Sequence, residues 1–219
     1  MCEHASNHIP SEYHGLGLTP VELTRHIAWD PGAAEVTRLL SQSLNAPAFL
    51  GSFSRLLIDL NRPLDSAGSI VTRSEATDIP GNLGLSPEEI ARRVGDIFTP
   101  YHAAVSAHLD ARQGRPTRLV SLHSFTPVFL GVARAWEGGI LFGDAAAFGE
   151  TLVSRLQSAG LRVGANVPYK TDRAEDYAVP VHGDDRGIPA VLVEMRNDLI
   201  ATRDGVHAWA QVLSTALQE

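Results

Sequence analysis

Residues 188–194 read Ile188-Pro189-Ala190-Val191-Leu192-Val193-Glu194, an apolar run that ends in a carboxylate. A continuous apolar run of this length, without alternation, is typical of a strand that is buried on both faces of a sheet. A second run of the same kind, Leu119-Val120-Ser121-Leu122, is followed directly by His123. The sequence therefore predicts two buried strands, each of which carries a polar side chain to the end of a sheet.

Helix and strand patterns alternate along the rest of the chain. Two further apolar runs predict strands at residues 55–60 and 139–143, and helical spacing predicts helices at 31–44, 86–109, 145–159 and 204–217. This alternation favours a single α/β domain over residues 1–219, with a largely parallel sheet covered by helices on both faces. The stretches 63–82 and 166–187 lack a regular pattern, and long loops of this kind are often functional.

The composition excludes several classes of protein. The 219 residues are 44% hydrophobic and carry a formal net charge of −7, which disfavours nucleic-acid binding because phosphate contacts need a basic face. No run approaches the ~18 apolar residues of a membrane span. The N-terminus has neither a basic region nor an apolar signal, so we expect a cytoplasmic protein. The single cysteine, Cys2, excludes a disulfide framework and cysteine-ligated zinc, so any metal must lie on His, Asp or Glu.

Three polar residues occupy positions suited to metal binding. His4 lies in Glu3-His4-Ala5, Asp30 precedes a predicted helix, and His123 follows a predicted strand. Ligands of α/β proteins collect at the carboxyl ends of strands. Two imidazoles and one carboxylate are a usual ligand set for catalytic zinc, with a fourth position left for water. The alternative is that these are ordinary surface or hydrogen-bonded residues.

Glu194 is a candidate general base. A carboxylate at the end of a buried run is costly to bury unless it is paired or employed. Near a metal it could take a proton from water. The alternative is a salt bridge with Arg196, which strand alternation places on the same face.

The arginines suggest an acidic substrate. Seventeen of the 18 cations are Arg, a count that genomic codon bias can also produce. Arg55, Arg62 and Arg196 lie at the edges or ends of predicted strands, where they could bind carboxylates, and Asp59 could orient Arg55. Ordinary solvated arginines are the alternative for each.

The second irregular stretch could close over such a site. Its candidate substrate-binding residues are Asn166, Tyr169 and His182, with Tyr177 nearby. An ordinary surface loop with incidental polar side chains is the alternative.

Five motifs, in order along the chain, resemble the N-formylglutamate amidohydrolase family. They are Cys2-Glu3-His4-Ala5-Ser6-Asn7-His8-Ile9-Pro10, Ile58-Asp59-Leu60-Asn61-Arg62-Pro63, Leu122-His123-Ser124-Phe125-Thr126-Pro127, Asn166-Val167-Pro168-Tyr169 and Glu194-Met195-Arg196-Asn197-Asp198-Leu199-Ile200. The family is similar in fold to zinc carboxypeptidases and zinc muramoyl amidases, which implies a three-layer αβα domain with a mixed, largely parallel central sheet.

The resemblance also implies roles for the candidate residues. His4, Asp30 and His123 would hold one zinc ion or another divalent metal, with Glu3 as a possible substitute for Asp30, and Glu194 would be the catalytic glutamate. The family has an apolar strand before the Glu-His motif, of which only Met1 and Cys2 are present here.

The expected function is a bacterial zinc-dependent amidohydrolase of histidine degradation. Its substrate would be a small acidic N-acyl amino acid, N-formylglutamate above all, with no nucleic-acid or membrane partner. One alternative is a zinc amidase or carboxypeptidase that acts on peptidoglycan or peptide fragments. Another is a protein that binds acidic metabolites without catalysis.

Overall fold

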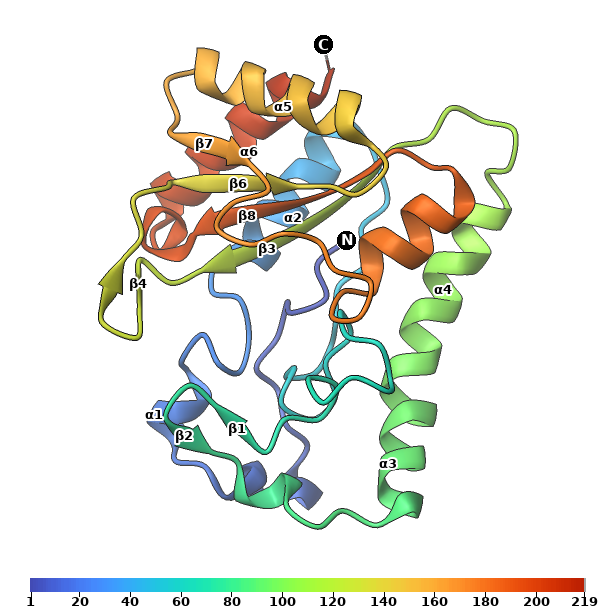
Figure 1. Ribbon diagram of the computed structural model, residues 1–219, viewed down its shortest axis with the longest axis vertical. Helices are drawn as coiled ribbons and strands as arrows, with labels where there is room; N and C mark the ends of the chain where they lie inside the picture. The colour runs from blue at the N-terminus through green and yellow to red at the C-terminus, as the bar shows by residue number, and fades with distance from the viewer. Residues whose placement is uncertain (219) are drawn as a thin grey trace.

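The computed structural model describes residues 1–218 and is built around a four-stranded sheet in the order β3-β8-β6-β7 (Figure 1). Strand β3 (Leu119–Phe125) pairs in parallel with β8 (Ala190–Arg196). Strand β6 (Gly138–Leu141) runs antiparallel to β8 and parallel to β7 (Val163–Ala165). The sheet is therefore mixed and largely parallel, and the two strands predicted from the apolar runs at 119–122 and 188–194 are confirmed.

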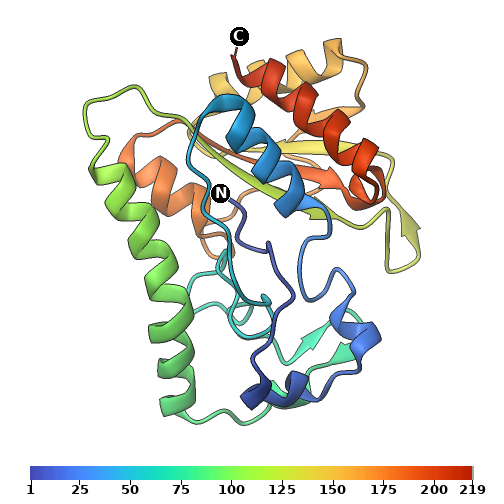
Figure 2. The same cartoon turned by 180° about the vertical axis from the view of Figure 1, so that it is seen from behind.

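Helices cover both faces of this sheet. One face packs against α2 (Ala33–Leu44), α5 (Ala146–Ser158) and α6 (Arg203–Gln218), and Figure 2 shows α2 and α6 side by side on it. The other face packs against α4 (Thr99–Asp110) and a π-helix, η4 (Ala178–Gly183). The predicted αβα layering is confirmed.

Successive side chains of β8 point to opposite faces of the sheet, so this strand contributes to the cores on both sides. Val191, Val193 and Met195 belong to the core under α2, α5 and α6, whereas Ala190 and Leu192 belong to the core under α4 and η4. All five side chains are buried, which accounts for the continuous apolar run in the sequence. Glu194 is two residues beyond Leu192, so its side chain points to the same face of the sheet, the one that α4 and η4 cover.

Residues 9–29 and 53–98 form a second layer of packing below the sheet, here called the lower body (Figure 1). Its core contains Leu16, Leu57, Ile79 and Phe98. The short elements of this region are η1 (Ser11–Gly17), α1 (Pro20–Leu23), β1 (Arg73–Ser74), β2 (Thr77–Asp78), η2 (Pro80–Asn82), α3 (Pro87–Arg93) and the π-helix η3 (Val94–Phe98). Helix α3 begins at the Ser86 N-cap and continues through η3 into α4, as predicted for residues 86–109.

The predicted strand at residues 55–60 is wrong. The segment consists of turns, although Leu56, Leu57 and Ile58 are fully buried in the lower body. Its backbone groups find partners outside any strand ladder: the Leu57 N–H donates to Ser54 O at 3.0 Å, and Leu57 O accepts from Arg93 Nη1 at 2.9 Å. A continuous apolar run indicates that a segment is buried, but it does not show that the segment is a strand. Here the buried segment is a turn.

The N-terminal residues lie between β3 and the segment around Leu50. The Met1 carbonyl accepts from Leu122 N at 2.9 Å, and Cys2 forms a parallel bridge with Leu50. This pairing carries Glu3 and His4 toward the end of β3. Among residues 1–218, no helix is both long and apolar enough to cross a membrane.

The remaining short elements connect the strands. The hairpin of β4 (Val128–Phe129) and β5 (Val132–Ala133) lies between β3 and β6, the 3₁₀ helix η5 (Asp184–Arg186) precedes β8, and the 3₁₀ helix η6 (Asn197–Ile200) follows it.

Candidate active site

Three distant segments bring His4, Asp30 and His123 together. One ligand atom from each lies within 4.8 Å of the others, and all three side chains are buried. Asp30 Oδ2 is 3.3 Å from His4 Nδ1 and 3.0 Å from His123 Nδ1. The structure thus places the three predicted metal-binding residues around one point.

Asp30 is directed into this cluster by the start of α2. Asp30 precedes the helix, as predicted, but it is not the N-cap: that residue is Gly32, whose φ of 82° is in the left-handed region. The Asp30 carboxylate therefore does not cap the helix and is available to the cluster. Its Oδ2 also accepts a hydrogen bond from Ser124 N at 3.1 Å. A Cβ at Gly32 would lie 2.5 Å from Ile200 O, so glycine is also required by close packing.

The second ring nitrogen of each histidine meets its own buried carboxylate. His4 Nε2 is 2.7 Å from Asp59 Oδ1, and His123 Nε2 is 2.9 Å from Glu3 Oε2. Metal-binding histidines commonly donate this second N–H to a carboxylate, which fixes the tautomer. The arrangement leaves both Nδ1 atoms to face Asp30. Glu3, considered from the sequence as a substitute ligand, instead lies behind His123.

The electrostatics of the cluster suit a bound cation. Burial alone would lower the pKa of His123, but hydrogen bonds with Asp30 and Glu3 raise it to about 10. Burial opposes ionisation of Asp30, yet His4 and His123 hold its pKa well below the usual range. Two imidazole nitrogens and a carboxylate oxygen are a donor set that zinc accepts, with metal replacing the proton on nitrogen. The residues present therefore fit a divalent metal.

Glu194 stands beside His123. The two residues are opposite each other in the parallel register of β8 and β3. Glu194 is 8% exposed, and its Oε2 has no hydrogen-bond partner. Burial, reinforced by the charge of Asp30, raises its pKa to about 7. The salt bridge with Arg196 does not form, because Arg196 Nε pairs with Asp198 Oδ1 at 2.8 Å.

Each of the three predicted substrate-binding arginines lies against a carboxylate. Arg55 reaches Asp59 Oδ2 at 2.6 Å and Asp30 Oδ1 at 3.4 Å, so it joins the two carboxylates that touch His4. Arg62 Nη1 is 3.1 Å from Asp176 Oδ1. The sequence-based pairing of Arg55 with Asp59 is present, although a turn rather than a strand produces it.

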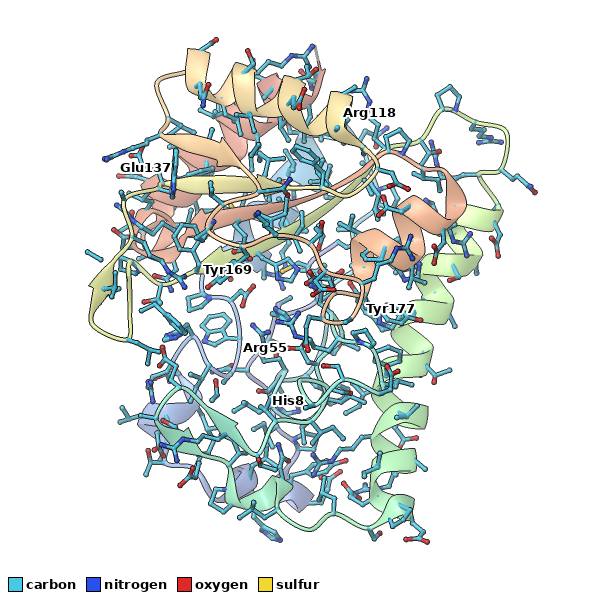
Figure 3. All side chains as sticks on the ribbon, in the orientation of Figure 1. His8, Arg55, Arg118, Glu137, Tyr169 and Tyr177 are labelled. Carbon is cyan, nitrogen blue, oxygen red and sulfur yellow. The ribbon has the colours of Figure 1, made fainter. Side chains whose placement is uncertain are left out.

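The residues predicted from the loop lie in different surroundings. Figure 3 shows Tyr169 near Arg55, where the sheet meets the lower body. Burial and the charge of Glu194 raise the pKa of the Tyr169 phenol, whereas the charges of Arg134 and Arg55 oppose the rise. Asn166 Oδ1 accepts from Phe142 N at 3.1 Å and supports the loop itself.

His182 lies apart from the metal-binding cluster, in a buried pair. Its Nε2 is 2.9 Å from His102 Nδ1, and His102 Nε2 is 2.9 Å from Leu60 O. The Tyr177 ring packs against His102 at 4.3 Å. His102 was not singled out from the sequence, where a histidine on a helix carries no signal of a partner 80 residues away.

The family model for N-formylglutamate amidohydrolase matches residues 1–201. The chain belongs to this family. Membership indicates an amidohydrolase that acts on non-peptide C–N bonds of a small molecule.

Two solved structures are similar to this chain. The crystal structure of gene product Atu2144 from Agrobacterium tumefaciens has a TM-score of 0.94 and 38% identity, with 99% of this chain and 88% of that chain covered. N-formylglutamate amidohydrolase from Ralstonia eutropha JMP134 has a TM-score of 0.76 and 17% identity, with 98% and 89% covered, and this second likeness shows the fold alone. No curated protein matches.

Proposed function

We propose that this protein hydrolyses the amide bond of a small acidic N-acyl amino acid, with N-formylglutamate as the substrate that its family favours. One observation carries the proposal: Glu194, a buried carboxylate with an unpartnered oxygen, stands in register beside His123 of the His4–Asp30–His123 cluster. A purely structural carboxylate in this position would be expected to have a partner.

His4 Nδ1, His123 Nδ1 and Asp30 Oδ2 would hold a single divalent metal, with zinc the ion that best suits the donor set. Such an ion, when bound, polarises an acyl carbonyl and makes water more acidic. Asp59 and Glu3 keep the two imidazoles oriented through their Nε2 atoms, and Arg55 holds Asp59 in place. Both imidazoles are thus held in orientation before a substrate binds.

Glu194 would move the proton. Its carboxylate accepts a proton from the attacking water and then delivers it to the amide nitrogen as the C–N bond breaks, so the products are a carboxylic acid and a free amine. A pKa of about 7 suits both halves of this task, because the group can accept and release a proton near neutral pH.

Arg55 and Tyr169 are the predicted substrate-binding residues that we retain at the site. Both lie where the sheet meets the lower body, and Arg55 is 24% exposed there. Arg62, Arg196, Asn166 and His182 are occupied by partners within the protein, and we assign them to holding the surrounding loops.

Metal analysis followed by a substrate panel tests the proposal. The purified protein would be stripped with a chelator, reloaded with zinc and assayed against formyl, acetyl and peptidyl amides of amino acids. We expect about one metal per chain, and release of formate from N-formylglutamate only in the reloaded protein. Cleavage of peptidyl amides alone would favour the peptidoglycan amidase, and a protein without metal or turnover would favour a non-catalytic binder.

A further inference from the structure

The hairpin of β4 and β5 leads into Arg134, whose guanidinium is enclosed by three aromatic rings. Its central carbon lies 4.8 Å from the ring centre of Phe129, 4.9 Å from Tyr169 and 5.4 Å from Phe125. These rings come from the end of β3, from the hairpin and from the loop before residue 170. Cation–π contacts with three separate segments hold the guanidinium in one place.

Arg134 differs from the other arginines around the site in having no counter-charge. Within residues 1–218, no ion pair joins it to a carboxylate, and its Nη1 is buried without a hydrogen-bond partner. Arg55, Arg62 and Arg196 each contact a carboxylate of the protein. A buried guanidinium N–H without an acceptor is unfavourable, so this group is suited to an anion supplied from outside.

The position of Arg134 relative to the cluster follows from the strand register. Phe125 lies two residues beyond His123 on β3, so both side chains leave the same face of the sheet, roughly 7 Å apart. The register also pairs Phe125 with Arg196, and Arg196 Nη1 lies 3.4 Å from the Arg134 carbonyl. Arg134 therefore lies beyond Phe125, next to the face of the sheet that carries His123 and Glu194. Its neighbour Tyr169 is also influenced by the charge of Glu194. In an N-acyl amino acid, a carboxylate lies a few bonds to one side of the acyl carbon.

We propose that Arg134 binds a carboxylate of the substrate and so selects N-acyl amino acids over neutral amides. The guanidinium offers a planar pair of N–H donors that match the two oxygens of a carboxylate, a geometry that a lysine ammonium does not reproduce. The inference rests on the proposed function in that the acyl group is taken to be cleaved beside Glu194. Arg134 thereby takes the specificity-determining role that the sequence suggested for Arg62 and Arg196, and it acts together with Arg55.

The test compares Arg134→Gln and Arg134→Lys with a matched control, Arg118→Gln. Arg118 also stacks on a ring, 5.1 Å from the centre of Phe148, and Figure 3 shows it far from Tyr169 and Arg55. The kcat and KM of each metal-loaded protein would be measured for N-formylglutamate and for its diamide, in which both carboxylates are neutral. We expect KM for N-formylglutamate to rise roughly 10- to 100-fold in Arg134→Gln. In Arg134→Lys we expect KM to stay above the wild-type value, because lysine keeps the charge but not the planar pair of donors. Hydrolysis of the diamide and all values for Arg118→Gln should stay at the wild-type level.

Equal losses on the two substrates would show a structural role for Arg134 and overturn the inference, as would unchanged kinetics. Thermal unfolding in the presence of glutarate, a dicarboxylate that cannot be hydrolysed, separates this inference from the proposed function. We expect glutarate to raise the Tm of wild type and Arg118→Gln but not of Arg134→Gln. If wild type fails to hydrolyse the formyl substrate while this pattern holds, the proposed function fails and the inference stands. If Arg134→Gln does not fold, a full glutarate shift in Arg134→Lys overturns the inference, and a reduced shift supports it.

Discussion

Glu194 and His123 lie directly opposite each other in the parallel pairing of β8 with β3. The apolar runs of β3 and β8 thus end at the same level of the sheet and place a carboxylate next to an imidazole. The carboxylate has no ion pair with Arg196, and its pKa is raised by burial to about 7. The chemistry proposed for this site follows from that adjacency, which the strand register fixes.

The carboxylates behind the histidines should govern metal affinity. We expect Glu3→Gln and Asp59→Asn each to weaken zinc binding about 10- to 100-fold, because the imidazoles lose the acceptors that fix their orientation and increase their basicity. Competition with a chromophoric chelator measures this directly. The exposed Glu150→Gln on α5 is the control and should bind as wild type. Wild-type affinity in both site variants would show that these contacts do not support a metal.

Gly51 tests how the N-terminal segment positions His4. A Cβ at Gly51 would lie only 2.0 Å from the Glu3 carbonyl oxygen, so alanine must push back the backbone that leads into His4. We expect Gly51→Ala to cost about 1–3 kcal/mol in the free energy of unfolding and to weaken metal binding. Urea unfolding measures the first effect.

The matched variant is Gly95→Ala, inside η3, where nothing lies within 4 Å of the added carbon. It should increase stability by about 0.5–1 kcal/mol, because alanine is the better helix former. If Gly51→Ala is as stable as Gly95→Ala, the close approach to Glu3 does not constrain the segment.

The buried pair of His102 and His182 predicts loss of stability in acid. Burial lowers the pKa of each imidazole from 6.5 to about 4, and His182 further disfavours the charge on His102. The unfolded chain therefore takes up protons first as the pH falls below 6.5, whereas the folded protein takes them up only near pH 4. The stability gained from keeping each imidazole neutral is full above pH 6.5 and is lost between pH 6.5 and 4, on the order of 3 kcal/mol for each imidazole.

Urea unfolding at a series of pH values checks the expected slope. His182→Leu should be less stable at neutral pH and should show a flatter dependence below pH 6.5. His207→Gln, at an exposed position on α6, should keep the wild-type slope. An unchanged slope in His182→Leu would mean that the pair does not titrate in this range.

Local patterns were enough to predict most of the framework. The apolar runs at β3 and β8 and the helical spacing of α5 and α6 match the structure, because burial on one or both faces of an element determines where its apolar residues occur. The turn at residues 55–60 has the same apolar pattern as a buried strand, although it is not one. Strand β7 was missed, since its three residues, Val163–Ala165, include a glycine and make too short a run.

The sequence was enough to propose the metal-binding residues of the site, but not the contacts that they make with residues far away in the chain. His4, Asp30 and His123 could be proposed because each follows or precedes an expected element. The contact of His4 with Asp59, 55 residues away, depends on how the lower body folds under the sheet. Arg134 carried no signal, because its aromatic surroundings are assembled from β3, the hairpin and the Tyr169 loop only in the folded protein.

The most direct test of the central claim is formate release by Glu194→Gln, measured together with its zinc content. We expect about one zinc per chain in both proteins and a kcat for N-formylglutamate that falls by roughly 10²- to 10⁴-fold, because glutamine preserves the shape of the side chain but cannot accept a proton. Wild-type turnover in a zinc-loaded Glu194→Gln protein would contradict the assignment of Glu194 as the base.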